Sequence, residues 1–186
     1  MGKDWDERYR KSPAPTEPAS LLTSLESLFP KQGKGLDLAC GAGRNSVWLA
    51  GRGLDVAAID LSGEALRQGR ELASRRRCHV RWLQEDLQSY ALGSAEYDVI
   101  TCFYIRIPKL YSRISKALRP GGWVVYETYN LAQLQYASGP RDPEHLLRPG
   151  ELLEAFRDLE VVFYLETSHE RAVSSIIARK PAGADW

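Results

Sequence analysis

Residues 36–45 read Leu-Asp-Leu-Ala-Cys-Gly-Ala-Gly-Arg-Asn, an apolar run followed by two glycines and a candidate helix. Glycine permits a tight turn and lets backbone amides approach a ligand that a Cβ would repel. In an open parallel sheet, ligands bind beyond the carboxyl ends of the strands, which is where this turn is expected. Glycine turns also occur as ordinary loops, so the neighbouring segments must decide between the two interpretations.

Strand-like and helix-like segments alternate along the chain around this turn. Strands that are joined by helices run parallel, because the crossover returns the chain to the starting edge. The last two strands are joined by only four residues and must run antiparallel. We therefore predict an α/β fold with a seven-stranded, mostly parallel sheet, helices on both faces and a C-terminal antiparallel hairpin. The predicted strands are Gly35–Cys40, Asp55–Asp60, Val80–Asp86, Tyr97–Phe103, Trp123–Tyr129, Leu159–Thr167 and Ala172–Arg179, and the predicted helices are Ala19–Phe29, Arg44–Ala50, Glu64–Arg77, Lys109–Leu118 and Glu151–Arg157.

The bulk composition restricts the class of protein. The 186 residues fit one domain, which we divide into an N-terminal helical arm (1–30), a core (31–180) and a tail (181–186), with a proline-rich linker at 12–18. A formal net charge of +1 argues against a nucleic-acid or anionic-membrane partner. Three scattered cysteines without a C-x-x-C pair predict reduced thiols and no metal site. The polar N-terminus and the lack of a long apolar run predict a cytoplasmic protein without a membrane span.

Three acidic residues stand at successive predicted strands around the glycine turn. Asp60 closes the second strand, where a carboxylate can accept both ribose hydroxyls, or it could cap the next helix, a role that Ser62 fills equally well. Asp86 ends the third strand and could contact an adenine amino group or simply be solvated. Asp37 lies between leucines, so its burial requires partners, either the amides of the turn or a ligand. Ser46 replaces the third glycine of a dinucleotide fingerprint, which weakens a nicotinamide or flavin interpretation.

These features resemble those of the class I S-adenosylmethionine-dependent methyltransferases, over nearly the whole chain. The resemblance implies a Rossmann-like fold, S-adenosylmethionine as the cofactor and methyl transfer to a small-molecule acceptor. It rests on residues 36–43, Asp60, Asp86, 97–100 and 118–122. A narrower resemblance, to the tellurite-resistance-type methyltransferases, rests on residues 43–46, 48–50 and 149–152 and on Trp5, Arg8 and Tyr9.

The resemblance also implies which residues contact the cofactor. The glycine turn would line its methionine and ribose portions, Asp60 would hold the ribose, and Cys102 and Phe103 would face the sulfonium. Trp5 and Tyr9, one helical turn apart, could form a lid or simply pack. The implied cofactor-binding residues are Trp5, Tyr9, Asp37, Ala39, Cys40, Gly41, Gly43, Arg44, Asn45, Asp60, Leu61, Asp86, Leu87, Cys102 and Phe103.

The acceptor pocket is expected above the ends of the fourth and fifth strands. Tyr104, Arg106, Glu127, Tyr129 and Asn130 are available there, and the loop at 139–148 can fold over them. Basic residues suggest an anionic acceptor such as an oxyanion or a carboxylate, with a solvated loop as the alternative. A thiol or a chalcogen compound is also a possible acceptor. Cys40 and Cys102 are expected to be apolar wall residues. The predicted catalytic residues are Tyr104, Arg106, His145 and Arg148.

Three rival functions stay open on the sequence alone. One is methylation of RNA or protein with the help of a partner, and another is nonenzymatic sensing of S-adenosylmethionine. A nicotinamide-dependent reductase is the third. The fourth predicted strand continues as Cys102-Phe103-Tyr104-Ile105, which lacks the tetrapeptide of methyltransferases that act on DNA adenine or protein glutamine. The sequence leaves the oligomeric state, monomer or homodimer, undetermined.

Overall fold

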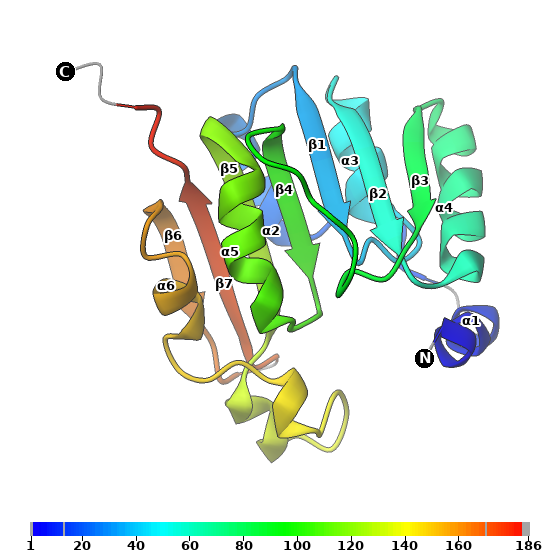
Figure 1. Ribbon diagram of the computed structural model, residues 1–186. Helices are drawn as coiled ribbons and strands as arrows, with labels where there is room; N and C mark the ends of the chain where they lie inside the picture. The colour runs from blue at the N-terminus through cyan, green and yellow to red at the C-terminus, as the bar shows by residue number, and fades with distance from the viewer. Residues whose placement is uncertain (1, 13, 170, 184–186) are drawn as a thin grey trace. The chain divides into compact units, whose positions relative to one another are not determined.

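The computed structural model describes residues 2–12, 14–169 and 171–183 (Figure 1). Pro13 of the predicted linker and residues 184–186 of the predicted tail lie outside the described residues. Within the described residues, seven strands form a sheet in the order β3-β2-β1-β4-β5-β7-β6, which confirms the predicted α/β fold. The strands are β1 (Lys34–Leu38), β2 (Asp55–Asp60), β3 (Val80–Gln84), β4 (Tyr97–Phe103), β5 (Leu118–Tyr129), β6 (Glu160–Glu166) and β7 (Val173–Arg179).

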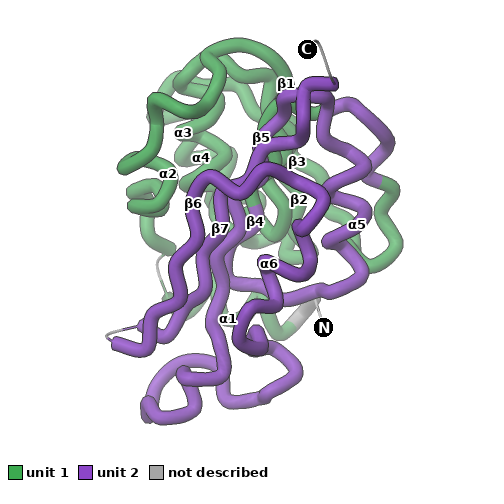
Figure 2. Tube along the Cα trace, turned by 90° about the vertical axis from the view of Figure 1, so that its left-hand side faces the viewer, with its two compact units in different colours: residues 1–91, 97–101 green, residues 92–96, 102–186 purple. Residues whose placement is uncertain are grey.

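Helices connect these strands much as predicted. They are α1 (Gly2–Lys11), α2 (Ser20–Ser24), α3 (Arg44–Gly51), α4 (Gly63–Arg76), α5 (Pro108–Ala117) and α6 (Glu151–Ala155), with 3-10 turns η1 (Glu26–Leu28), η2 (Leu131–Gln135) and η3 (Pro143–His145). The predicted helix at 19–29 was wrong in its length, because the backbone of Leu25 leaves the helical region at φ −121° and separates α2 from η1. The chain forms two compact units, residues 1–91 with 97–101 and residues 92–96 with 102–186 (Figure 2).

In the first unit, β1, β2 and β3 pair in parallel. The β1–β2 register runs from Lys34 opposite Asp55 to Leu38 opposite Ile59, and β3 pairs with the other edge of β2. The interior of β2 is buried along its whole length, as expected for parallel strands that are covered on both faces. The carboxyl ends of β1 and β2 therefore meet at one edge, where the glycine turn begins.

In the second unit, β7 is inserted between β5 and β6 and pairs antiparallel with both. The predicted terminal hairpin is confirmed, and its second strand is an interior strand of the sheet. β5 begins earlier than predicted, because Gly121 and Gly122 continue the ladder with Lys180 at N–O distances of 2.9 and 2.8 Å. Three aromatic rings, of Tyr111, Tyr126 and Phe156, pack at centroid distances of 5.7 to 6.1 Å and form part of this unit's core.

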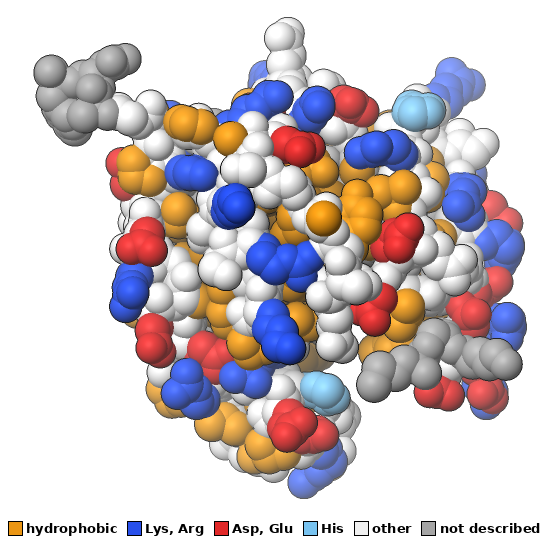
Figure 3. Space-filling view, viewed as in Figure 1, with side chains coloured by type: hydrophobic (Ala, Val, Ile, Leu, Met, Phe, Trp, Pro, Cys, Tyr) orange, Lys and Arg blue, Asp and Glu red, His pale blue; other side chains and the backbone are white. Residues whose placement is uncertain are grey.

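The surface carries charges of both signs. Figure 3 shows Lys and Arg side chains interspersed with Asp and Glu side chains on the face in view, in keeping with the net charge of +1. Among the described residues, every helix is too short or too polar to cross a membrane.

Candidate functional site

The turn after β1 has an unusual backbone. Ala39, Gly41 and Gly43 have positive φ angles of 53°, 55° and 74°. Glycine adopts this region at little cost, but a residue with a Cβ such as Ala39 is held there at a cost of about 1–3 kcal/mol. Such strain is concentrated at ligand and active sites. The turn therefore has the backbone character of a functional loop.

Asp60, the last residue of β2, fastens this turn. One carboxylate oxygen accepts a hydrogen bond from the Gly41 amide at 2.8 Å, and the other accepts one from the Ser62 amide at 2.9 Å. Burial raises the pKa of Asp60 and these two amides oppose that rise. Ser62 is the N-cap of α4, since its hydroxyl accepts from the Ala65 amide at 3.0 Å. The alternative that Asp60 caps this helix is therefore excluded.

Asp37 is buried beneath the turn, with 1% of its surface exposed. Its carboxylate accepts hydrogen bonds from the hydroxyls of Ser46 at 2.5 Å and Thr101 at 2.8 Å. The predicted partners were the turn amides or a ligand; two side-chain hydroxyls hold the carboxylate instead of the turn amides, and contact with a ligand stays a prediction. The two hydroxyl donors come from α3 and β4, so Asp37 joins three elements of the first unit.

Asp37→Asn is expected to change how folding stability depends on pH. Burial raises the pKa of Asp37 from 3.8 to about 6, against the opposing hydrogen bonds from Ser46 and Thr101. Between these values the folded protein holds a proton that the unfolded chain has released. The stability from this group is complete below about pH 4 and is lost as the pH rises through about 6, a change of about 3 kcal/mol at ~1.4 kcal/mol per pKa unit.

Urea unfolding of both proteins between pH 4 and 7 measures this change. The free energy of unfolding of the wild type should fall relative to that of Asp37→Asn as the pH rises. A difference between the two proteins that stays constant over this range would contradict the assignment.

Helix α1 is tethered to the start of α4. One oxygen of the Asp6 carboxylate accepts from the Ser62 hydroxyl at 2.6 Å and from the Glu64 amide at 3.0 Å. The Gln68 side-chain amide donates to the backbone carbonyl of Tyr9 at 2.9 Å. These contacts hold α1 beside the glycine turn, within the first unit.

Tyr9 lies against the turn and Trp5 is largely solvent-exposed. A Cβ placed on Gly41 would stand 2.4 Å from the Tyr9 hydroxyl. Burial, with the nearby charge of Asp60, raises the pKa of Tyr9 to about 12. The Trp5 side chain is 45% exposed, and the guanidinium carbon of Arg8 lies 5.0 Å from the centre of its ring. Tyr9 thus packs on the glycine turn, and a lid of Trp5 and Tyr9 over the cofactor stays a prediction.

Trp82 covers the second glycine of the turn. A Cβ on Gly43 would stand 2.2 Å from the ring of Trp82, which projects from β3. Both glycines therefore have a packing requirement of their own, besides any role in ligand binding. Trp82 was not among the predicted site residues, because its distance in sequence from the turn leaves no local signal of the contact.

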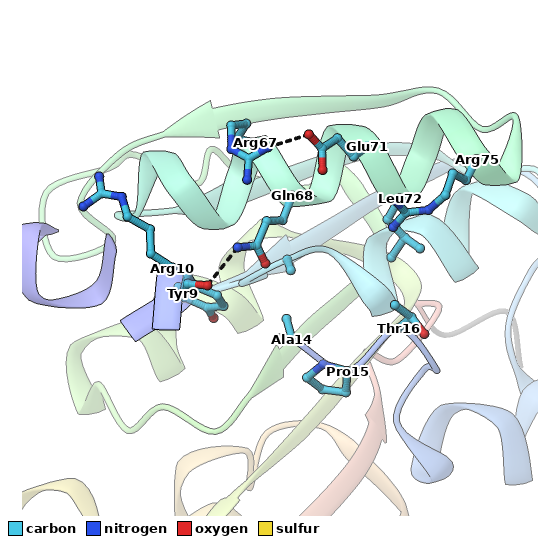
Figure 4. Close-up of a pocket in the computed structure, with 11 residues that line it drawn as sticks. Tyr9, Arg10, Ala14, Pro15, Thr16, Arg67, Gln68, Glu71, Leu72 and Arg75 are labelled. Atoms are coloured by element: carbon cyan, nitrogen blue, oxygen red, sulfur yellow. Dashed lines mark hydrogen bonds and ion pairs between the residues drawn. The ribbon is translucent and has the colours of Figure 1, made fainter. Parts of the chain in front are cut away.

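The first residues of α3 bind the preceding segment of the chain. The Asn45 side-chain oxygen accepts from the Ala19 amide at 2.9 Å, and the Arg44 guanidinium donates to the Glu17 carbonyl at 3.4 Å. This segment, residues 14–16 in particular, and α4 enclose a cavity of about 370 Å³ (Figure 4). The cavity reaches the glycine turn through Ala42.

Asp86 and Leu87 follow β3, which ends two residues earlier than predicted. The exposed Asp86 carboxylate accepts from the Gln88 amide at 2.9 Å, and its backbone carbonyl accepts from the Ser89 and Tyr90 amides. Asp86 therefore opens a turn, while Leu87 is 6% exposed. Contact of either residue with an adenine stays a prediction.

Arg106, a predicted anion-binding residue, is engaged with an acid. Its guanidinium donates to both carboxylate oxygens of Glu151 at 2.7 and 3.0 Å and to the Glu144 carbonyl at 2.8 Å. Glu151 is 4% exposed and also accepts from the Tyr111 hydroxyl at 2.8 Å. Burial acts to raise the pKa of Glu151, but the bonds from Arg106, the Arg148 amide and Tyr111 outweigh it and lower this pKa.

The other predicted catalytic residues lie in the same unit. The Arg148 side chain is 64% exposed and approaches Glu151 at 3.4 Å, and His145 is exposed at the end of η3. Cys102 and Phe103 are buried at the end of β4. Tyr104, with φ at +60°, donates to Glu127 at 2.9 Å. Glu151 was not among the predicted site residues, because it lies 45 positions from its partner Arg106 in the sequence.

Comparison with known proteins agrees with this geometry. A methyltransferase-domain family model matches residues 36–122. A ubiquinone biosynthesis O-methyltransferase from Burkholderia vietnamiensis is 31% identical over 153 residues, covering 69% of this chain and 65% of that relative. The chain spans less than two thirds of the length of the first curated relatives, down to 46% for a putative methyltransferase, YqeM, from Bacillus subtilis.

Two solved structures share the fold. TehB from Haemophilus influenzae superposes with a TM-score of 0.75 at 20% identity, over 95% of this chain and 67% of that chain. The [4+2]-cyclase SpnF gives a TM-score of 0.76 at 15% identity, over 98% of this chain and 95% of that chain. The fold is therefore Rossmann-like, and residues 36–122 are similar in sequence to a methyltransferase domain.

Proposed function

We propose that this protein binds S-adenosylmethionine and transfers its methyl group to a small-molecule acceptor. The observation that carries the proposal is the Asp60 bridge, which brings a carboxylate and the Gly41 amide together at the ends of β2 and β1. Each oxygen of Asp60 accepts one backbone bond and, having further lone pairs, can accept a ribose hydroxyl as well. A pair of cis hydroxyls on a ribose matches such a carboxylate.

Other side chains would contact the bound cofactor. Leu61 and Leu87 would pack on the adenine, and Cys102 with Phe103 would face the methyl group. Tyr9 lies against Gly41, so α1 acts as a lid that shifts when the cofactor enters. The half-buried Cys40 serves as an apolar wall. The pKa of its thiol is raised chiefly by desolvation and then by Asp37, and a raised thiol pKa disfavours the reactive thiolate.

The main task of the protein in this reaction is to align the acceptor with the methyl group of the cofactor. The cofactor supplies a methyl group on a sulfonium, which is a good leaving group. The residues must place the acceptor's nucleophile behind that carbon and exclude water, an alignment worth roughly 7–11 kcal/mol of barrier. Arg106 serves to hold Glu151 and the loop at 143–148. Arg148 and His145 are the exposed basic residues of that loop, and we propose that they bind an anionic group on the acceptor.

Calorimetry tests the first half of this proposal. S-adenosylmethionine and its demethylated product should each bind with micromolar affinity and one-to-one stoichiometry, and a nicotinamide cofactor should give no heat. The absence of heat with both sulfur compounds would refute the proposal. Binding without turnover on a broad panel of phenols, thiols and carboxylates would favour a nonenzymatic sensor, and steeply salt-dependent RNA binding would favour an RNA substrate.

A further inference from the structure

Tyr104 and Glu127 of the second unit are locked together at two points. The Tyr104 amide donates to the backbone carbonyl of Glu127 at 2.8 Å, and the Tyr104 hydroxyl donates to the Glu127 carboxylate at 2.9 Å. The tyrosine ring also packs on Tyr129 at a centroid distance of 5.6 Å. The carboxylate of Glu127 is therefore fixed in position relative to the residue that directly follows β4.

The second oxygen of Glu127 is held from β7. Ser175 is paired with Glu127 in the β5–β7 ladder, and its hydroxyl donates to that oxygen at 2.8 Å. The Arg171 guanidinium approaches the Tyr104 hydroxyl at 3.4 Å. Both oxygens are thus oriented by neutral hydroxyls. Glu127 is half-buried, so part of its surface is exposed to solvent.

Tyr104 holds a strained backbone to make these contacts. Its φ of +60° lies in the left-handed region, which costs a bulky residue about 1–3 kcal/mol. Gly or Asn would adopt the same turn with less strain. Strain of this kind persists where the surrounding structure over-determines it, and it is concentrated at functional sites.

We propose that Glu127 is the general base of the reaction, with Tyr104 and Ser175 as positioning residues. The inference rests on the proposed function. As the acceptor oxygen or sulfur forms its bond to the methyl carbon, its proton passes to a Glu127 oxygen. The carbon–sulfur bond of the cofactor breaks, and its electron pair remains on the sulfur. The products are the methylated acceptor, the neutral thioether and protonated Glu127.

The chain contains a matched control for this group. Glu166 accepts from the hydroxyls of Tyr164 and, at 3.2 Å, of Ser174, which repeats the Tyr–Glu–Ser grouping. Ser174 and Ser175 are consecutive in β7, so their side chains point to opposite faces of the sheet. Glu166→Gln therefore makes the same chemical change on the other face.

The test compares two probe acceptors, catechol, which is neutral at pH 7, and 4-nitrocatechol, which is largely ionised there. Glu127→Gln should lower kcat for catechol by about 10²- to 10⁴-fold, the usual contribution of general-base catalysis. It should lower kcat for 4-nitrocatechol less than tenfold, because the ionised acceptor needs no base. Glu166→Gln should change neither. Glu127→Asp, which withdraws the carboxylate by one methylene, should show a smaller loss, again confined to catechol.

A second readout needs no turnover. The visible absorbance of 4-nitrocatechol reports its ionisation when it is bound without the cofactor. Removing the negative charge of Glu127 should shift this ionisation to lower pH by about one unit, and Glu166→Gln should leave it in place. The proposal would be overturned if Glu166→Gln lowered kcat more than Glu127→Gln, or if Glu127→Gln lowered kcat equally for both acceptors. It would also be overturned if the wild type methylated neither acceptor. Cofactor binding by calorimetry would still stand in each case and would test the proposed function separately.

Discussion

Asp60→Ala should weaken the binding of S-adenosylmethionine by about a hundredfold or more. A hydrogen bond to a charged group contributes about 1.5–3 kcal/mol, and Asp60 is proposed to accept from two ribose hydroxyls. The same carboxylate also holds the amides of Gly41 and Ser62. Removal of the carboxylate therefore takes away the proposed hydrogen-bond acceptor of the ribose. It also takes away the acceptor of the two amides that hold the turn in place.

Calorimetric titration with S-adenosylmethionine measures the effect. Asp55→Ala removes an exposed acid at the opposite end of the same strand and should bind with wild-type affinity. Asp60→Asn keeps one acceptor oxygen and should fall between the two. A folded Asp60→Ala protein with unchanged affinity would remove Asp60 from the site, whatever the fate of the other residues.

Glu151→Ala should destabilise the protein by about 3–5 kcal/mol, the cost of breaking a buried ion pair by removing one partner. Arg106 is only 17% exposed in its side chain and would lose both of its charged bonds to Glu151. The hydroxyl of Tyr111 and the amide of Arg148 would also lose their acceptor. Water cannot fully replace these partners at a site that is 4% exposed.

Urea unfolding at pH 7 measures this loss against a control on the same helix. Glu154 is 71% exposed and lies 3.6 Å from Arg148, so Glu154→Ala should stay within about 0.5 kcal/mol of the wild type. The double variant Arg106→Met with Glu151→Met should recover much of the loss, because an apolar pair leaves no uncompensated charge. Similar stabilities of Glu151→Ala and Glu154→Ala would show that the pair contributes no structural stability.

The sequence predicted the elements well where hydrophobic periodicity is local. The strands β2 and β4 have the predicted bounds, and the helix cap at Ser62 was among the alternatives. Predictions were weaker wherever a partner is distant in sequence. The partners of Asp37 come from positions 46 and 101, and hydroxyl side chains there carry no signal of what they bond.

In the candidate site, too, the predictions that rest on local sequence patterns were better than those that depend on distant partners. The glycine turn and Asp60 could be located, because each has a recognisable place at the end of a strand. The anion-binding role of Arg106 was inferred from its charge alone. Its acidic partner, Glu151, lies on α6, and only the folded structure brings the two residues together. Charge in a sequence indicates what a residue can bind, and the fold decides whether a neighbour already occupies it.

The placement of β7 has a consequence for how the chain acquires its structure. β5 and β6 are both made before β7, yet neither pairs with the other without it. During synthesis, the backbone amides and carbonyls of β6 therefore stay bonded to water until residues 173–179 have emerged from the ribosome. A nascent chain halted before Val173 would expose the ladder edges of both strands, which is the kind of edge that chaperones cover and that promotes aggregation.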